Sequence, residues 1–308
     1  MSNNNLSDWQ KEQKKKDEAN KLLESTALNG DLEKFIYLTS CEEYKGIIDP
    51  ACGGNYPLRA ASLRGHIPIV NFLINFPEKE KRKQITAYEN INAAICAAVE
   101  YGQDEVCLYF KSKTPKAYKK FINEGHHNSI LNVATMRGYH STIQLIANDI
   151  ADKSNWNYNL FIKNSVQYNK SECFEYFLTN MDKNKFNTNE NLIEIAHTAL
   201  YNQRFEFLDK IIKNSELNLN EHITVGHFAI LVEVKPDSLQ HIIEKYEYQP
   251  NKKLMDEINN YLDKKEDTRL TKDISNFVNF LEKHRLQKEI REELSEIPMV
   301  NQSKKSKI

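Results

Sequence analysis

The chain has 308 residues, enough for one or two ordinary domains or for one elongated array of repeated units. Its 42 Lys and Arg residues nearly balance 43 Asp and Glu residues, so a formal net charge of −1 gives no overall field that would attract nucleic acid or an anionic membrane. With only 9 glycines and 8 prolines, the composition favours helices joined by short turns over a sheet protein.

Five cysteines make an odd number, and none belongs to a C-x-x-C motif or has the histidine spacing of a zinc site. We expect them to be reduced and mostly buried. No stretch reaches the roughly 18–20 apolar residues that span a bilayer, and the polar N-terminus lacks the apolar core of a signal peptide. The sequence therefore predicts a cytoplasmic protein with no membrane insertion, metal or cofactor.

The first predicted element is a helix over residues 7–24. Ser7 followed three residues later by Gln10 is a capping-box pattern, which marks the start of a helix. The residues after it are rich in lysine. We expect residues 1–24 to form a polar cap on whatever array follows.

A repeated pattern fills residues 25–248 and is clearest in YPLRAASLRGHIPIVNFL, residues 56–73. Pro57 suits the first position of a helix, and Gly65 suits the left-handed conformation that ends one. Ile69, Val70 and Leu73 then form one apolar stripe on a second helix. Related segments recur at intervals of 31 to 37 residues, and their anchor residues are Gly30, Gly65, Gly102, Gly138, Asn169, Gln203 and Val234.

The segment from Gly54 to Ile74 resembles the ankyrin repeat family. The matching residues are Gly54, Pro57, Leu58, Ala61, Gly65, His66, Ile69, Val70, Leu73 and Ile74. The resemblance implies an all-α, ankyrin-type helix-turn-helix solenoid of about seven divergent repeats. Tyr56 and Arg59 replace the Thr and His that tie successive repeats of the family together, so we expect lower local stability than in a consensus array. We expect the extra residues at 78–90 and 112–128 to lengthen the finger loops or to add turns to helices.

Beyond residue 248 the repeat fades, and we expect two helices over residues 249–297 that cap the array, followed by a disordered tail over 298–308. A glutamate cluster at 289, 292, 293 and 296 precedes a Ser- and Lys-containing end. It resembles the signals of effectors that intracellular bacteria export through type IV secretion systems. The alternative is a solvated helix end with charge pairs four residues apart.

The chain contains no phosphate-binding loop, dinucleotide fingerprint, zinc-protease or nucleophile-elbow motif. His126 and His127 lack further metal ligands at suitable spacing, so the tip of a finger loop is the favoured interpretation. A Cys52–His66 catalytic pair is disfavoured because Gly54, beside Cys52, and His66 match turn positions of the family. The lysines from Lys111 to Lys120 indicate a solvated insertion rather than a nucleic-acid site. We therefore predict no catalytic residue.

In ankyrin proteins a concave face, which includes the two residues before each first-helix glycine, holds the partner. Carried over to this chain, the resemblance implies that a monomer binds a protein partner through Arg64, Tyr101, Met136, Arg137, Tyr168 and Tyr201. Tyr and Arg are enriched among interface hot spots. The predicted function is non-catalytic protein binding by a bacterial effector secreted into the host cell cytosol. The alternatives are an enzyme whose site lies in the C-terminal helices or the 112–128 insertion, and an endogenous intracellular scaffold.

Overall fold

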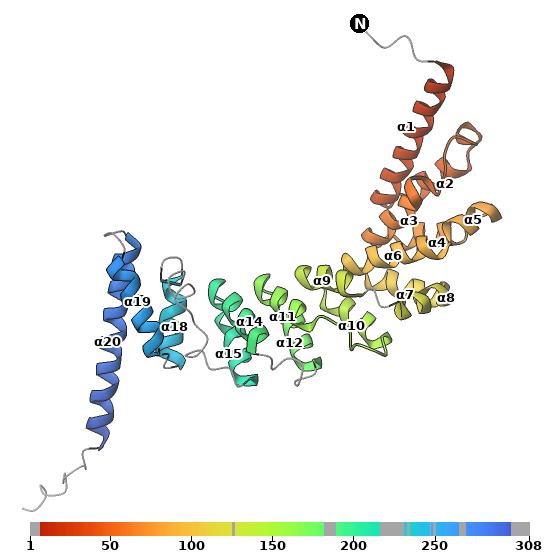
Figure 1. Cartoon of the computed structure of the whole chain (residues 1–308). Coiled ribbons are helices and arrows are strands. Elements are labelled where there is room, and N and C mark those ends of the chain that lie inside the picture. Colours follow the sequence, from red (N-terminus) through yellow and green to blue (C-terminus); the bar gives the residue numbers. More distant parts are fainter. Residues whose placement is uncertain are drawn as a thin grey trace, which may run out of the picture. The chain divides into compact units, whose positions relative to one another are not determined.

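The computed structural model describes residues 7–124, 127–181, 189–215, 231–232, 235–246, 248, 251–264 and 269–296. Every regular element within these residues is a helix (Figure 1), which confirms the all-α fold class. No helix in this part of the chain is long and apolar enough to cross a membrane. The predicted seventh anchor, Val234, and the predicted disordered tail over 298–308 lie outside the described residues.

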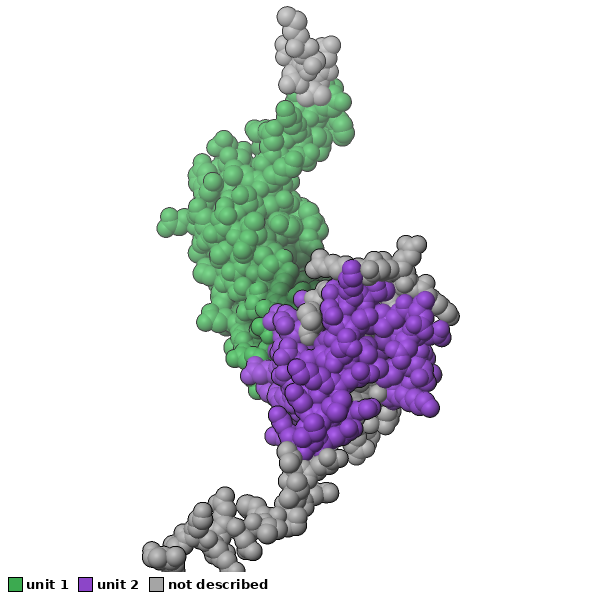
Figure 2. Space-filling view, turned by 90° about the vertical axis from the view of Figure 1, so that its left-hand side faces the viewer, with its two compact units in different colours: residues 1–181 green, residues 182–308 purple. Residues whose placement is uncertain are grey.

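The chain divides into two compact units, residues 1–181 and 182–308, which Figure 2 colours green and purple. The first unit contains five helical hairpins in succession. In each hairpin the first helix contacts the first helix of the next hairpin, and the second helices contact one another in the same order. The hairpins are α1 (Asp8–Asn29) with α2 (Leu32–Ser40), α3 (Cys52–Arg64) with α4 (Ile67–Ile74), α6 (Tyr88–Glu100) with α7 (Asp104–Lys113), α9 (His127–Arg137) with α10 (His140–Asp149), and α11 (Tyr158–Gln167) with α12 (Ser171–Asn180).

Each hairpin turns at a residue in the left-handed conformation, as predicted. The anchor φ angles are +78° at Gly30, +79° at Gly65, +70° at Gly102 and +86° at Gly138, and they remain positive at Asn169 (+58°) and Gln203 (+55°). Five of these turns also close with the Schellman hydrogen bond, in which the residue after the anchor donates to a carbonyl five residues earlier, as from His66 N to Ala61 O at 2.8 Å. One turn geometry therefore recurs although the anchor residue changes.

The anchor glycines are also needed for space. The residue after each anchor lies against the anchor of the preceding hairpin, so a Cβ on Gly30 would come within 2.5 Å of the His66 ring, and one on Gly102 within 2.6 Å of the Tyr139 ring. His66 Nε2 also makes a hydrogen bond with Leu28 O at 3.0 Å. The side chain that follows one turn thus binds the end of the helix before it and couples neighbouring hairpins.

A second coupling comes from asparagines that stand ten residues before the anchors. Asn20 Oδ1 accepts a hydrogen bond from Asp49 N at 2.9 Å, and Asn55 Nδ2 donates to Ile85 O at 3.1 Å. Asn128 donates to Asn155 O at 2.9 Å and accepts from Asn157 N at 3.0 Å. Each side chain ties a first helix to the backbone that leads into the next hairpin. We call the set at this position, Asn20, Asn55, Asn92, Asn128 and Asn159, the asparagine column.

The start of α3, predicted at Pro57, is irregular. Gly53, Gly54 and Asn55 have φ angles of +57°, +64° and +64°, so the right-handed part of α3 begins only after them, next to Pro57. Residues without a Cβ, and asparagine, tolerate this conformation best. The left-handed turn places Asn55 in the interior, with 1% of its surface exposed, where it reaches Ile85.

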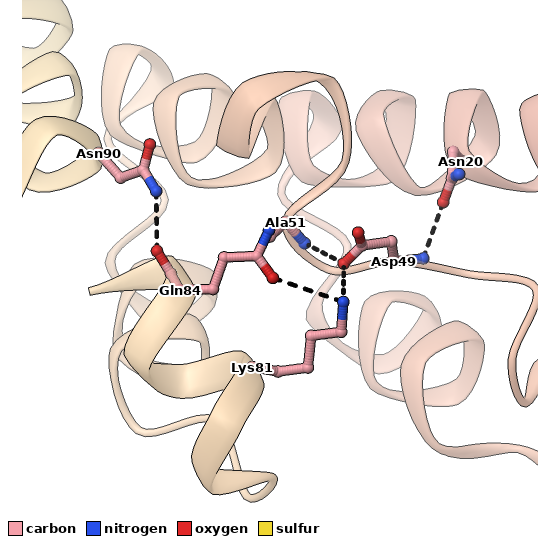
Figure 3. Close-up of polar contacts among 6 residues, drawn as sticks. All are labelled: Asn20, Asp49, Ala51, Lys81, Gln84 and Asn90. Carbon is pink, nitrogen blue, oxygen red and sulfur yellow. Dashed lines mark hydrogen bonds and ion pairs between the residues drawn. The ribbon is translucent and has the colours of Figure 1, made fainter. Parts of the chain in front are cut away.

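The two predicted insertions form separate helices, α5 (Lys79–Ile85) and α8 (Pro115–Asn123), and a 3₁₀ turn, η1 (Glu42–Tyr44), occupies an earlier connection. They are therefore helical connections and not extended finger loops. Figure 3 shows how α5 is held: Lys81 Nζ binds Asp49 Oδ1 at 3.0 Å, and the carbonyl of Gln84 accepts from Asn90 Nδ2 at 2.8 Å.

The predicted capping box is present, because Gln10 N donates to Ser7 Oγ at 3.3 Å and Ser7 N donates to Gln10 Oε1 at 2.8 Å. However, α1 continues to Asn29, since no helix-breaking residue precedes Gly30. The predicted boundary between residues 24 and 25 therefore falls inside one continuous helix that serves as the first helix of the first hairpin.

The second unit contains α14 (Asn189–Tyr201) and α15 (Phe205–Asn214), which form a hairpin around Gln203, and then α18 (Pro236–Tyr246), α19 (Lys252–Lys264) and α20 (Arg269–Glu296). Helix α14 contacts α15 and α18, and α19 contacts α20. The two expected C-terminal helices are thus confirmed as helices. Leu286 and Ile290 in the second half of α20 are 53% and 49% exposed.

Candidate functional site

Five of the predicted binding residues lie in the first unit at the C-terminal ends of consecutive first helices. We call them the turn strip: Arg64, Tyr101, Met136, Arg137 and Tyr168. Tyr101 and Tyr168 are 38% and 41% exposed, Arg64 and Arg137 are exposed, and Met136 is half-buried. Because neighbouring first helices pack side by side, these ends form one row. The sixth predicted residue, Tyr201, belongs to the second unit and is 51% exposed.

Tyr101 and Arg137 form a defined pair within the turn strip. The Arg137 guanidinium lies 4.0 Å from the centre of the Tyr101 ring, and its NH1 group donates to Glu100 O at 2.6 Å. These contacts cross from one hairpin to the next. They hold the guanidinium in one orientation at the surface, and its other N–H groups remain available to a ligand.

A residue that the sequence did not single out joins this pair. Lys170 follows the anchor Asn169, and its Cδ would lie 2.8 Å from a Cβ placed on Gly138, the residue next to Arg137. Its side chain therefore lies over the turn that ends α9. The sequence signal was available: Lys170 occupies the same position as His66 and Gln103, which contact the preceding hairpin.

Arg64 and Met136 complete the turn strip without a comparable contact. The described residues offer Arg64 no hydrogen bond or ion pair, and its side chain is exposed. Met136 is half-buried one position before Arg137. The structure thus brings together Tyr101, Arg137 and, through Gly138, Lys170, while Arg64 stands two hairpins before Arg137.

The interpretation of His127 as a loop tip is wrong. His127 begins α9, is 3% exposed, and its Nε2 lies 3.2 Å from Phe121 O, because α8 folds back over the start of α9. His126 lies outside the described residues. Within the described part of the chain, no group of three or more His, Cys, Asp and Glu side chains is arranged to hold a metal ion.

The lysine-rich insertion is only partly a solvated segment. Tyr118 and Phe121 are buried, at 5% and 4% exposure, and Tyr118 donates to Asp149 Oδ2 at 2.8 Å. Lys111 forms an ion pair with the same carboxylate at 2.7 Å. Tyr118 therefore ties α8 to Asp149 of α10, and the Phe121 ring lies against His127 of α9, so neither ring stands among the lysines as a stacking surface for bases.

The three buried thiols are poor nucleophiles. Burial, reinforced by Glu24, raises the pKa of Cys52 to about 12. Burial likewise raises the pKa of Cys107 and of Cys173 to about 12. All five cysteines are free, although Cys41 and Cys96 are only half-buried. His66, the proposed partner of Cys52 in a catalytic pair, binds Leu28 O instead.

The second unit has a small cavity of about 130 Å³ where α18, α19 and α20 meet. Tyr248, one of its lining residues, is 1% exposed, and its hydroxyl finds no hydrogen-bond partner among the described residues. Burial raises the pKa of this hydroxyl above its ordinary value. The remaining lining residues are Ile243, Met255, Leu281, Glu282, His284 and Arg285.

Comparisons with known proteins identify no relative of this chain. No family model matches it. No curated protein and no solved structure matches it either.

Proposed function

We propose that the first unit is an ankyrin-type solenoid that binds a protein partner, without catalysis, through the turn strip. The observation that carries the proposal is the exposed Tyr101–Arg137 pair, which is oriented by contacts across two hairpins and leaves guanidinium donors unused. The recurrent left-handed anchors and the side-by-side first helices support an array whose helix ends form a continuous surface.

Pre-organisation is the physical reason for expecting useful affinity. A flexible arginine loses rotamer freedom when it docks, at a cost of roughly 0.5–1.5 kcal/mol for a long side chain. Arg137 has already lost much of that freedom in the free protein, because Tyr101 and Glu100 O hold it. Exposed tyrosines add contact area with only two side-chain torsions to fix. The turn strip is therefore better prepared for binding than an ordinary charged surface.

The proposal is tested with a triple variant, Arg64→Ala, Tyr101→Ala and Arg137→Ala, in the full chain. A matched control replaces three exposed lysines of α7 and α8, Lys113, Lys116 and Lys119, by alanine. Captured partners are compared for both variants by quantitative mass spectrometry, and helicity is checked by circular dichroism. We expect the strip variant alone to lose its partner. Equal capture by all three proteins would refute the turn strip as the binding surface.

The biological setting proposed from the sequence is a type IV-secreted effector that acts on a host protein, and an endogenous scaffold is the rival. The glutamates of the proposed signal lie at the end of α20 and beyond it the chain is rich in Ser and Lys. Deleting residues 289–308 and measuring translocation into host cells separates the two. Translocation that persists after the deletion would remove the basis for a C-terminal signal.

A second candidate function is an active site in the C-terminal helices, and the cavity beside His284 is the observation that favours it. The cavity combines an imidazole with a carboxylate and a buried phenol, groups capable of acid–base chemistry. A screen of small hydrolysable esters with the His284→Ala variant as control tests this alternative. Turnover that is the same in both proteins would exclude His284 as the catalytic group.

A further inference from the structure

We infer that the partner presents an acidic peptide segment, which docks on Tyr101, Arg137, Tyr168 and Lys170. We call these four residues the cationic patch. The inference deepens the proposed function and rests on it, because it assigns a chemistry to the ligand of the turn strip. All four residues belong to the first unit and come from α6, α9 and the turn between α11 and α12.

Two cationic residues of the patch come from neighbouring turns. Lys170 Nζ would lie 3.5 Å from a Cβ on Gly138, and Gly138 directly follows Arg137 in the chain. The left-handed turn at Gly138, with φ of +86°, is what lets the lysine of the next hairpin lie this close to the end of α9. The two cationic residues thus belong to neighbouring turns of one row, where Arg137 reaches back to Tyr101 and Lys170 reaches back to Gly138, although 33 positions separate them in the sequence.

Neither cation is neutralised by the described part of the protein. Arg137 binds a carbonyl oxygen and a ring face, and Lys170 makes no ion pair with any residue that the structure describes. Two carboxylates occupy neighbouring positions, Glu100 and Glu172, but neither lies within ion-pairing distance of Arg137 or Lys170. Elsewhere in the unit, exposed lysines do find carboxylates, as Lys111 finds Asp149. An exposed arginine and a half-buried lysine on neighbouring turns, both without a carboxylate partner among the described residues, favour an anionic ligand.

The geometry selects carboxylates on a peptide. The free edge of a guanidinium forms paired hydrogen bonds with the two oxygens of a carboxylate, and an ammonium supplies a second charge. The flanking rings of Tyr101 and Tyr168 give apolar contact to the rest of the segment, since they are 38% and 41% exposed. The patch covers three adjacent first helices, hence about 16–20 Å. An extended segment of roughly five or six residues spans that distance.

The test uses three fluorescein-labelled peptides of one length with the full chain. They alternate glycine and tyrosine with glutamate in the first, glutamine in the second and lysine in the third. Binding is measured by fluorescence polarisation at about 50 and 300 mM NaCl. We expect the glutamate peptide to bind at least about tenfold more tightly than the glutamine peptide, and to weaken as salt screens the charges.

The variant Arg137→Glu with Lys170→Glu should lose that tenfold preference and gain affinity for the lysine peptide. The matched control, Lys116→Glu with Lys119→Glu on α8, changes the net charge equally and should bind the glutamate peptide within about twofold of the parent. If the charge reversal lowers helicity, Arg137→Gln with Lys170→Gln gives the same loss without repulsion. Equal binding of the three peptides, or equal loss in the patch and control variants, overturns the inference.

Partner capture tests the proposed function, and it is measured separately from the peptide binding that tests this inference. If partner capture depends on Arg64, Tyr101 and Arg137 while the parent protein shows no preference for the glutamate peptide, the acidic segment is refuted and the turn strip stands. If capture is also independent of these residues, both fail. Preference for the glutamate peptide that the patch variant abolishes supports the inference.

Discussion

Replacing Gly102 by alanine tests whether the anchor turns are held by backbone conformation alone or also by packing. Gly102 has φ of +70°, and a Cβ there would meet the Tyr139 ring at 2.6 Å. Gly46 is the matched control, because its φ of +74° is the same while nothing lies within 4 Å of its Cβ position. The two substitutions therefore share the conformational cost and differ in the steric one.

The left-handed conformation costs an alanine about 1–2 kcal/mol relative to glycine. That is the whole loss expected for Gly46→Ala. At Gly102 the Tyr139 ring must also leave its rotamer, which adds about 0.5–1.5 kcal/mol. The expected total is about 1.5–3.5 kcal/mol, because the two costs add at one turn. Moving Tyr139 also loosens its contact with the preceding hairpin, so the folded array is weakened where α6 meets α9.

Urea unfolding followed by circular dichroism measures both variants. We expect the midpoint for Gly102→Ala to fall further than that for Gly46→Ala, with similar slopes if the unfolded states expose similar surface. A double variant with Tyr139→Ala should bring the loss at Gly102 back toward the Gly46 value, since the clashing ring is gone. If Gly102→Ala and Gly46→Ala are equally destabilised, the ring contact does not contribute and the packing argument is wrong.

Three further predictions follow from the same contacts. Asn128→Ala should cost about 0.5–1.5 kcal/mol in urea unfolding, because it removes hydrogen bonds to two backbone groups of exposed residues, which water then pairs. Asn92→Ala, at the same position of another hairpin but without a hydrogen bond among the described residues, should cost less than half as much. Asn169→Gly should raise the free energy of unfolding by up to about 1 kcal/mol, because glycine adopts a φ of +58° with less strain than asparagine does. Burial favours the protonated form of Asp209, but hydrogen bonds from Lys245 and Tyr246 outweigh burial and hold the pKa of this carboxyl below its ordinary value. The resulting stabilisation is present above the unfolded pKa, about 4, and is lost as the pH falls through the folded pKa. The free energy of unfolding of Asp209→Asn should therefore depend less on pH in the acid range.

The turns could be predicted from the sequence because their positive φ favours one residue type, glycine. Only glycine adopts a positive φ without strain, so a glycine that recurs between two apolar stripes marks a helix end. Even the weaker anchors Asn169 and Gln203 follow the same geometry, with φ of +58° and +55°. The apolar stripes were equally readable, since Ile69, Val70 and Leu73 are fully buried.

The polar ties could not be predicted with the same reasoning, although their residues recur at a fixed offset. An asparagine near a helix start is usually interpreted as a cap or a solvated side chain. Asn55 and Asn128 instead bind backbone groups about 30 residues later, and nothing local in the sequence reveals a partner at that distance. The lower local stability expected from Tyr56 and Arg59 concerns only the positions that tie ankyrin repeats together. The asparagines tie the hairpins together at a different position.

The cationic patch could not be predicted either, because its residues are far apart in the sequence. In the sequence, Lys170 is one of many lysines of a divergent repeat. Its position after an anchor indicates packing against the preceding hairpin and not a binding role. In the folded unit that position lies against the preceding turn, so the residue after one anchor meets the previous anchor itself. Tyr101 and Arg137 meet across hairpins for a related reason.

Coupling between hairpins and a surface for binding therefore arise from one geometric fact, the offset by which each turn overlaps the one before it. The side chain after an anchor fills the space that glycine leaves, as His66 does over Gly30, and its polar end reaches the carbonyl of the preceding helix. Where that side chain is a lysine, as at position 170, it brings a positive charge to the turn of the preceding hairpin. Replacing Lys170 by methionine should keep the packing and the unfolding midpoint while removing the charge. Stability and ligand preference should thus be separable at a single residue, and a midpoint that falls together with peptide affinity would contradict this separation.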